Sequence, residues 1–247
     1  MTRDEEWLLS EKYHGERTED FFTDCERLKT GEPLAYVIGH VPFLDTTIWL
    51  PTKPLIPRTE TEYWVNEIIE TKLRVHENPV KVLDLCAGSG CIGVAVLQAI
   101  PKSTVDFVER DTSHHPTIIL NIRENGIVPT RARIFGGDLF EHVTDTYDYI
   151  LTNPPYIDQS LGRTEPSVLE HEPHNALFAD NGGMALIEKI IEHASLHLTP
   201  KGVLVIEHEP EHVDAICILG EKHGYVSTAH VDQYGILRYT ILSRKPS

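Results

Sequence analysis

Residues 82–90 read VLDLCAGSG, and this stretch contains the clearest fold signal in the chain. Its first four residues are apolar apart from one aspartate, which is typical of a short buried strand. The small residues that follow predict a tight turn, and residues 91–99 continue as an apolar helix. A strand that leads through a small-residue turn into a helix indicates an α/β fold.

The turn at residues 86–90 has the properties of a ligand-binding turn. Gly88 and Gly90 can adopt backbone conformations that bulkier residues resist, so a ligand can approach the backbone closely. The N–H groups at the start of the following helix suit the carboxylate of a bound amino-acid moiety. The glycine spacing departs from the dinucleotide-binding fingerprint. By itself the turn is a weak signal, because a tight turn without a ligand has the same sequence.

Acidic residues follow the next two strand-like segments. Residues 104–108 end at Glu109, nineteen positions after the last glycine of the turn. An acidic residue about 20 positions on, at the end of the second strand, can accept both hydroxyls of a ribose. After a third strand-like run at residues 132–135, Asp138 can accept from an adenine amino group while Leu139 packs near the ring. Together the two acids favour adenosine, although each alone would be an ordinary loop residue.

The most informative motif is Asn153-Pro154-Pro155-Tyr156, directly after the apolar run at residues 147–152. An amide nitrogen shares its lone pair with the carbonyl and is a poor nucleophile. If the Asn153 side-chain oxygen and the Pro154 carbonyl each accept one N–H of a planar NH2 group, they orient its nitrogen for attack on a methyl donor. The prolines hold the backbone rigidly, and Tyr156 supplies an aromatic wall. The motif predicts methylation of an amide or amino nitrogen, the alternative being an ordinary turn.

Four features occur in this order along the chain: the turn at residues 86–90, Glu109, Asp138 with Leu139, and the motif at residues 153–156. Together they resemble the AdoMet-dependent methyltransferases of the Rossmann-like class. Residues 31–36, 56–62 and 169–173 narrow the resemblance to the release-factor glutamine N5-methyltransferase family. The resemblance covers the chain from about Gly31 to its C-terminus. It implies that the cofactor is S-adenosyl-L-methionine (AdoMet). It also implies that the acceptor is the side-chain amide nitrogen of the glutamine in the Gly-Gly-Gln motif of a peptide-chain release factor.

The resemblance further implies which residues bind the two substrates. The residues expected to bind the cofactor are Cys86, Ala87, Gly88, Ser89, Gly90, Glu109, Asp138, Leu139 and Asn153. The residues expected to bind the substrate are Asn153, Pro154, Pro155 and Tyr156, of which Asn153, Pro154 and Tyr156 are expected to be catalytic. The chain departs from the family at three places: Cys86-Ala87 stands where Gly-Thr is usual, Glu109 where Asp is common, and Thr59 where proline is usual. The third departure bears on the path of the linker.

Other functions are compatible with parts of this pattern. Ribosomal-protein glutamine methyltransferases often carry cysteine at the places of Cys86 and Cys91, whereas residues 58–62 favour the release-factor group. DNA adenine-N6 methyltransferases use a similar Asn/Asp-Pro-Pro-aromatic strand end. A net charge of −16, from 22 basic and 38 acidic residues, opposes binding to nucleic-acid phosphate. A non-catalytic adaptor would not need the intact motif at residues 153–156.

The composition sets the remaining expectations. A chain of 247 residues, 40% of them hydrophobic, can bury one sizeable core and a small appendage. No run approaches the roughly 20 apolar residues of a membrane span, and the N-terminus lacks signal-peptide features, so we expect a cytoplasmic protein. The four cysteines form no CxxC pair, and the 14 histidines form no convincing ligand set, so we expect no metal site. We expect a release factor as the protein partner and no direct contact with nucleic acid or membrane, and leave open whether an activating subunit exists.

The alternation of segments predicts an α/β fold with a doubly wound, mostly parallel seven-stranded sheet and a C-terminal antiparallel hairpin. The predicted strands lie at residues 82–85, 104–108, 132–135, 147–152, 203–207, 226–231 and 237–242. The predicted helices lie at residues 4–12, 18–29, 60–76, 91–99, 184–198 and near 211–223. The expected domains are a short helical N-terminal segment (1–30), a linker with a β-hairpin around Leu44 and Asp45 (31–58), and the AdoMet-dependent catalytic domain (59–247).

Overall fold

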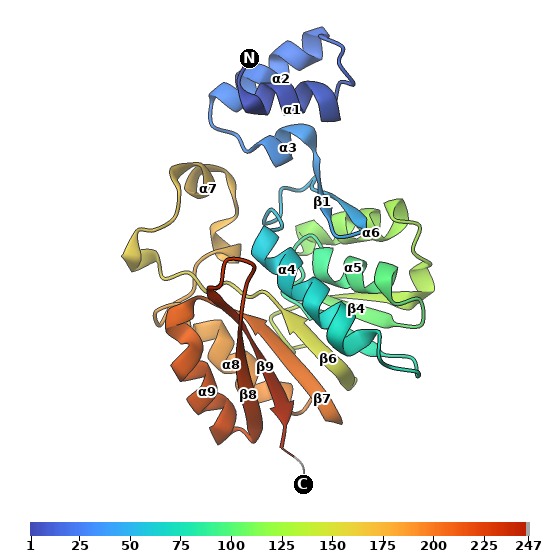
Figure 1. Ribbon diagram of the computed structural model, residues 1–247, viewed down its shortest axis with the longest axis vertical. Helices are drawn as coiled ribbons and strands as arrows, with labels where there is room; N and C mark the ends of the chain where they lie inside the picture. Colours follow the sequence, from blue (N-terminus) through green and yellow to red (C-terminus); the bar gives the residue numbers. More distant parts are fainter. Residues whose placement is uncertain (246–247) are drawn as a thin grey trace.

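A computed structural model describes residues 1–245 of the protein. The main body is one seven-stranded sheet with helices on both faces, and the N-terminal helices stand apart from it at one end (Figure 1). The order of the strands across the sheet is β5-β4-β3-β6-β7-β9-β8. These strands are β3 (Lys81–Leu85), β4 (Thr104–Glu109), β5 (Ala132–Gly136), β6 (Tyr147–Thr152), β7 (Leu198–Glu207), β8 (Tyr225–Val231) and β9 (Leu237–Arg244).

The neighbouring strands from β5 to β7 run parallel, whereas β9 runs antiparallel to both β7 and β8. The predicted mostly parallel, doubly wound sheet with a final antiparallel hairpin is therefore confirmed. The strand order reverses between β3 and β6, because β4 and β5 lie on one side of this pair and β7 on the other. Open α/β sheets bind their ligands at such a reversal, beyond the carboxyl ends of the strands.

Helices cover both faces of the sheet. On one face pack α4 (Thr59–Ile68), α5 (Cys91–Ala99) and α6 (His115–Glu124), and on the other α8 (Ala185–Ala194) and α9 (Val213–Lys222). Val82 and Leu151 belong to the apolar cluster under the first group of helices, whereas Leu83 and Ile150 belong to the cluster under the second. Successive side chains of a strand point to opposite faces, so strands covered on both sides are apolar throughout.

The helix predicted at residues 60–76 is shorter in the structure. It is α4, which ends at Ile68 and continues as a π-helical turn, η1 (Ile69–Leu73). Two further short helices, α3 (Leu34–Ile38) and α7 (Pro166–His171), as well as α6, were not predicted. Helix α6 contains Pro116, which a helix tolerates in its first turn but not in its interior.

The helix predicted at residues 184–198 is also shorter. It is α8, and it ends at Ala194 because Leu198 already begins β7. The predicted strand at residues 203–207 is only the second half of β7. The first half of β7 contains Pro200. The pairing of β6 with β7 is irregular between Tyr147 and Tyr149, and a proline is tolerated within a strand at such an irregularity.

A β-hairpin joins the N-terminal helices to the main body, in the segment proposed as the linker. Its strands are β1 (His40–Phe43) and β2 (Thr46–Trp49), and they turn at the predicted place. The side-chain amide of Asn121 accepts from the Trp49 N–H at 2.7 Å and donates to the Trp49 carbonyl at 3.1 Å. Asn125 makes the same pair of bonds with Thr47. Asn121 of α6 and Asn125, which caps the C-terminal end of this helix, thus bind the edge of β2 as a neighbouring strand would.

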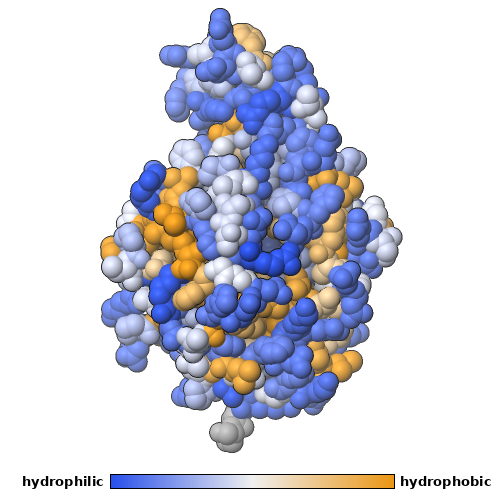
Figure 2. All heavy atoms as spheres, turned by 180° about the vertical axis from the view of Figure 1, so that it is seen from behind, coloured by the Kyte–Doolittle hydropathy of each residue, from blue (hydrophilic) through white to orange (hydrophobic). Residues whose placement is uncertain are grey.

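The N-terminal helices form a small lobe with an apolar centre of its own. It contains α1 (Arg3–Glu11), α2 (Glu19–Lys29) and α3, and the buried apolar side chains at its centre are Leu8, Phe21, Cys25 and Val37. Its surface is largely hydrophilic, whereas apolar patches lie on the main body (Figure 2). Within residues 1–245 no helix is both long and apolar enough to cross a membrane.

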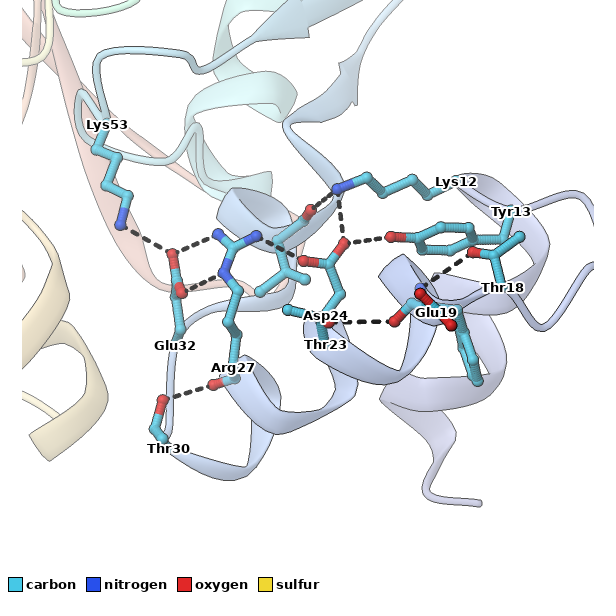
Figure 3. A network of polar contacts seen from close by, with 12 residues as sticks. Lys12, Tyr13, Thr18, Glu19, Thr23, Asp24, Arg27, Thr30, Glu32 and Lys53 are labelled. Atoms are coloured by element: carbon cyan, nitrogen blue, oxygen red, sulfur yellow. Dashed lines mark hydrogen bonds and ion pairs between the residues drawn. The ribbon is translucent and has the colours of Figure 1, made fainter.

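The buried carboxylate of Asp24 joins the helices of this lobe (Figure 3). It accepts hydrogen bonds from Lys12, Tyr13 and Arg27, each at 2.7 Å. Lys12 also donates to the Val37 carbonyl of α3 at 2.8 Å. Burial alone would raise the pKa of Asp24, but its three donors together lower that pKa below the usual value. Asp24 is therefore an ionised link between α1, α2 and α3.

We expect the substitution Asp24→Asn to loosen the N-terminal lobe and leave the sheet intact. The asparagine cannot accept from three donors at once, so amide hydrogen exchange in α1 and α2 should become roughly 10-fold faster. Glu26→Gln is the matched control, because Glu26 pairs with Lys29 on the exposed face of the same helix. Exchange rates in Asp24→Asn that equal those of the wild type would contradict this role.

Candidate functional site

The turn after β3 and the motif after β6 begin side by side. Leu85 pairs with Thr152 of β6 and with Val108 of β4. The residues that follow these three are Cys86, Asn153 and Glu109, so they emerge at one edge of the sheet. Thr152 Oγ1 reinforces the pairing by donating to the Leu85 carbonyl at 2.7 Å.

A cavity lies at this edge, and we call it the turn cavity. The predicted cofactor residues that line it are Cys86, Ala87, Gly88, Ser89, Glu109, Asp138, Leu139 and Asn153. Gly90 is the exception, because it does not line the cavity. Instead it packs inward, where a Cβ would lie 3.1 Å from Ile118 Cγ2. Gly90 thus packs against Ile118, and its predicted contact with the cofactor stays a prediction.

The turn keeps its backbone open to the cavity. Cys86, Gly88 and Gly90 have φ angles of 63°, 54° and 78°, the left-handed conformation that favours glycine. A Cβ on Gly88 would meet no atom within 4 Å, so there is open space beside this residue. A ligand can therefore approach the backbone at Gly88.

The carboxylate of Glu109 is held in place by backbone donors. Its two oxygens accept from the N–H groups of Gly88 at 2.8 Å and Asp111 at 2.7 Å. A carboxylate has about four lone-pair positions, so each oxygen can accept one more hydrogen bond. Glu109 thus supports the turn and still presents acceptors suited to a pair of hydroxyl groups.

Asp84 lies beneath the turn and was not predicted as a functional residue. Its Oδ2 accepts from the Gly93 N–H of α5 at 2.8 Å, whereas its buried Oδ1 has no partner within residues 1–245. Burial raises the pKa of Asp84 well above its usual value, the Gly93 bond lowers it, and the nearby charge of Glu109 raises it further. A charged residue inside an apolar strand was the available sequence signal.

The two cysteines beside the cavity are poor nucleophiles. Burial raises the pKa of the Cys86 thiol to about 12, and it does the same for Cys91. A thiol reacts as the thiolate, which is scarce at neutral pH when the pKa is so high. Within residues 1–245 no group of His, Cys, Asp and Glu is arranged to hold a metal ion.

A second cavity adjoins the first, and we call it the motif cavity. Its lining includes Pro154, Tyr156, Ile157 and Arg163. Both cavities are lined by Leu55, Arg58, Asn153 and Ala176. Asn153 therefore stands at the boundary between the two spaces.

The side chain of Asn153 uses its nitrogen for the protein and leaves its oxygen free. Asn153 Nδ2 donates to Thr61 Oγ1 at 3.1 Å. Within residues 1–245, neither Asn153 Oδ1 nor the Pro154 carbonyl accepts a hydrogen bond. Both groups thus remain available as acceptors, Asn153 at the boundary of the two cavities and Pro154 in the lining of the motif cavity.

Tyr156 has a second role besides lining the motif cavity. Its hydroxyl donates to Glu207 Oε1 at 2.9 Å. Burial raises the pKa of Tyr156 well above its usual value, and the nearby Glu207 adds to the effect. The phenol therefore stays protonated at neutral pH. Pro155, predicted to bind the substrate, lines the turn cavity and not the motif cavity.

Glu207, at the end of β7, was not predicted as a site residue. Besides Tyr156, it binds Thr61 Oγ1 at 2.7 Å and Trp64 Nε1 at 2.6 Å, both through Oε2. Glu207 is only 1% exposed. Burial raises the pKa of Glu207, and these three donors counteract the rise only in part. A glutamate that ends an apolar strand was the available signal, but its partners are about 145 residues away in the chain.

Arg58 connects the linker to the segment after the motif. Arg58 Nη2 donates to Glu172 Oε1 at 2.7 Å, and the Ile56 N–H donates to Glu172 Oε2 at 3.1 Å. Because Arg58 lines both cavities, this pair helps to form the wall that they share. Residues 56–62 and 169–173 both belong to the resemblance described above, but the contact between them was not predicted.

Known proteins match this chain over most of its length. A family model described as "Methyltransferase small domain" matches residues 67–171. A release factor glutamine methyltransferase of Lactococcus lactis is 32% identical over 203 residues, which cover 81% of this chain and 72% of the relative. One of Salmonella typhimurium is 31% identical over 211 residues, covering 85% and 74%. A 4-amino-L-phenylalanine/4-methylamino-L-phenylalanine methyltransferase of Streptomyces pristinaespiralis is 33% identical over 194 residues, covering 76% and 65%.

Solved structures share the fold at low sequence identity. A methyltransferase from Pyrococcus furiosus has a TM-score of 0.61 and 17% identity, covering 91% of this chain and 99% of that one. A 16S rRNA N2 G1207 methyltransferase of T. thermophilus, in complex with AdoMet and guanosine, has a TM-score of 0.59 and 17% identity, covering 84% and 50%. At these identities the likeness concerns the fold alone.

Proposed function

The chain belongs to the release factor glutamine methyltransferase family, and we propose that it methylates the glutamine of the Gly-Gly-Gln motif in peptide-chain release factors. The acceptor atom is the side-chain amide nitrogen, and the methyl donor is AdoMet. Relatives named for this activity match the chain over most of its length. The geometry at Asn153 supports the same reaction independently.

The turn cavity has the chemistry that AdoMet requires. The anchored carboxylate of Glu109 suits the two ribose hydroxyls, and Asp138 suits the amino group of adenine. The open space beside Gly88 allows the amino-acid part of a ligand to lie against the backbone. When bound, AdoMet supplies an electrophilic methyl group on its sulfonium sulfur.

The motif cavity receives the glutamine carboxamide. Asn153 Oδ1 and the Pro154 carbonyl each accept one of its N–H bonds and thereby orient the nitrogen. Both acceptors are rigid, because Thr61 holds the Asn153 amide and proline restricts the backbone. A fixed orientation matters because the carboxamide lone pair is delocalised.

The single observation that carries this proposal is the position of Asn153. It lines both cavities, and its side-chain oxygen is unpaired among the described residues. A nitrogen held there faces the turn cavity. The nitrogen can lose its surplus proton after it has been alkylated, so no residue has to act as a base during the attack.

Incubation of the protein with AdoMet and a purified release factor tests the proposed function. Mass spectrometry should find one added methyl group on the Gly-Gly-Gln glutamine, and none on a release factor in which that glutamine is alanine. Ribosomal proteins and DNA serve as the competing substrates. Methylation of one of these, without methylation of the release factor, would overturn the proposal.

Asn153→Ala should reduce kcat and leave AdoMet binding little changed. Loss of one of the two acceptors misorients the amide nitrogen, and we expect a decrease of roughly 100-fold. Steady-state methyl transfer gives kcat, and isothermal titration gives the AdoMet affinity. The control is Asn66→Ala, because Asn66 lies on α4 and lines neither cavity. Near-normal turnover by Asn153→Ala would exclude the assigned role.

Glu109→Ala should weaken AdoMet binding more than it lowers kcat. Hydrogen bonds to a charged group contribute about 1.5–3 kcal/mol, so the Kd should rise roughly 10- to 100-fold. Titration of AdoMet into the variant measures this change. Glu124→Ala on α6 is a control, because that glutamate pairs with Arg123 away from the cavity. An unchanged Kd in Glu109→Ala would reject the ribose assignment.

A further inference from the structure

Four side chains form a continuous line of hydrogen bonds that ends at Asn153. Trp64 Nε1 and Thr61 Oγ1 both bind Glu207 Oε2, at 2.6 and 2.7 Å, and Asn153 Nδ2 binds Thr61 Oγ1 at 3.1 Å. Trp64, Thr61 and Glu207 are at most 2% exposed. Water therefore has little access to replace any of these partners, and each group has to be satisfied by the others.

Glu207 determines which partner donates in each of these hydrogen bonds. The indole N–H of Trp64 can only donate, so Glu207 Oε2 has to accept. The ionised carboxylate of Glu207 has no hydrogen to donate, so its other oxygen, Oε1, accepts from Tyr156. Oε2 of the ionised Glu207 therefore accepts from Thr61 as well as from Trp64.

The orientation of the Thr61 hydroxyl in turn determines the orientation of the Asn153 side-chain amide. A threonine hydroxyl has one hydrogen, and here it is donated to Glu207. Toward Asn153 the same oxygen can only accept, so the amide has to turn its NH2 group to Thr61. The reversed amide would bring two oxygens together with no hydrogen between them. Asn153 Oδ1 is thereby directed away from Thr61.

We propose that Thr61 is a positioning residue that sets the orientation of the Asn153 side-chain amide, and that Trp64 and Glu207 set the direction of the Thr61 hydroxyl. The inference rests on the proposed function, since only an Asn153 that presents Oδ1 can accept an N–H from a carboxamide. A reversed Asn153 would present donors to the donors of the substrate. Thr61 acts through Asn153 and contributes no group to the reaction itself.

A different role for Glu207, as a base that receives the substrate proton, makes opposite predictions. Glu207 is not among the residues that line either cavity, and both its oxygens are engaged. Glu207→Gln separates the two roles. The glutamine carbonyl oxygen can accept from Trp64 and Thr61, while its NH2 group donates to Tyr156, so the direction of the line is kept. If Glu207 were instead the base, Glu207→Gln would remove it and turnover would be lost.

The orientation can be measured without any methyl acceptor. In protein labelled with 15N-asparagine, hydrogen exchange of the Asn153 side-chain NH2 should be slow in the wild type, in Thr61→Ser and in Glu207→Gln. Thr61→Val should make this exchange about 10-fold faster, because it removes the only acceptor of that group among the described residues. Thr46→Val is the matched control, because Thr46 is equally buried and donates to Phe43 in the hairpin.

Turnover provides the second measurement. Thr61 also lines the turn cavity, so the comparison is between two effects: Thr61→Val should lower kcat at least 10-fold and change AdoMet affinity much less, whereas Thr61→Ser and Glu207→Gln should retain most of the activity. Thr61→Val combined with Asn153→Ala should be no slower than Asn153→Ala alone, because the two residues act as a unit. A purely structural role of Thr61 would lower stability without this coupling.

The outcomes separate the two proposals. A wild-type protein that does not methylate the release factor contradicts the proposed function, while the exchange measurement still tests the orientation of Asn153. Slow Asn153 exchange or normal kcat in Thr61→Val would overturn the inference. If that variant does not fold, fast exchange and lost turnover in Glu207→Gln would overturn it instead.

Discussion

The parallel register of β3 with β4 and β6 is the constraint on which the rest of the structure depends. Leu85 pairs with both Val108 and Thr152, so these three residues lie at the same level of the sheet. The residues that follow them, Cys86, Glu109 and Asn153, therefore lie close together at one edge. Because the strand order reverses between β3 and β6, the connections diverge there and leave room for two adjoining cavities. The backbone of the turn and the carboxylate of Glu109 then stabilise each other through the Gly88 bond.

A second constraint comes from the buried carboxylate of Glu207. Placing such a group in the interior costs free energy unless donors surround it, and α4 and the Asn153 motif supply those donors. Satisfying Glu207 therefore holds α4 against the end of β7 and aligns Thr61 with Asn153. The same contacts that compensate for burial also orient the polar groups of the site. Packing and chemistry are coupled here through one carboxylate.

Much of the fold could be predicted, because strands covered on both faces form continuous apolar runs. Every predicted strand lies within an observed one. The ends of helices were predicted less well: α4 passes into a π-helical turn, and α8 ends early where β7 begins, since tertiary pairing and not local propensity sets these limits. In the site, the residues after the strand ends line the turn cavity as expected, except Gly90, which faces the side chains of Phe107 and Ile118.

The sequence by itself determined the order of strands and helices, the small-residue turn, the acids after the second and third strands, and the Asn-Pro-Pro-Tyr motif. These are local patterns, set by the period of apolar residues and by the backbone preferences of glycine and proline. Only the tertiary structure decided that Thr61, Trp64 and Glu207 would meet beside Asn153, and that Arg58 would meet Glu172. Such partners lie up to about 145 residues apart along the chain. Nothing in a local pattern records which buried carboxylate a distant donor will satisfy, because that depends on how the sheet and its covering helices pack.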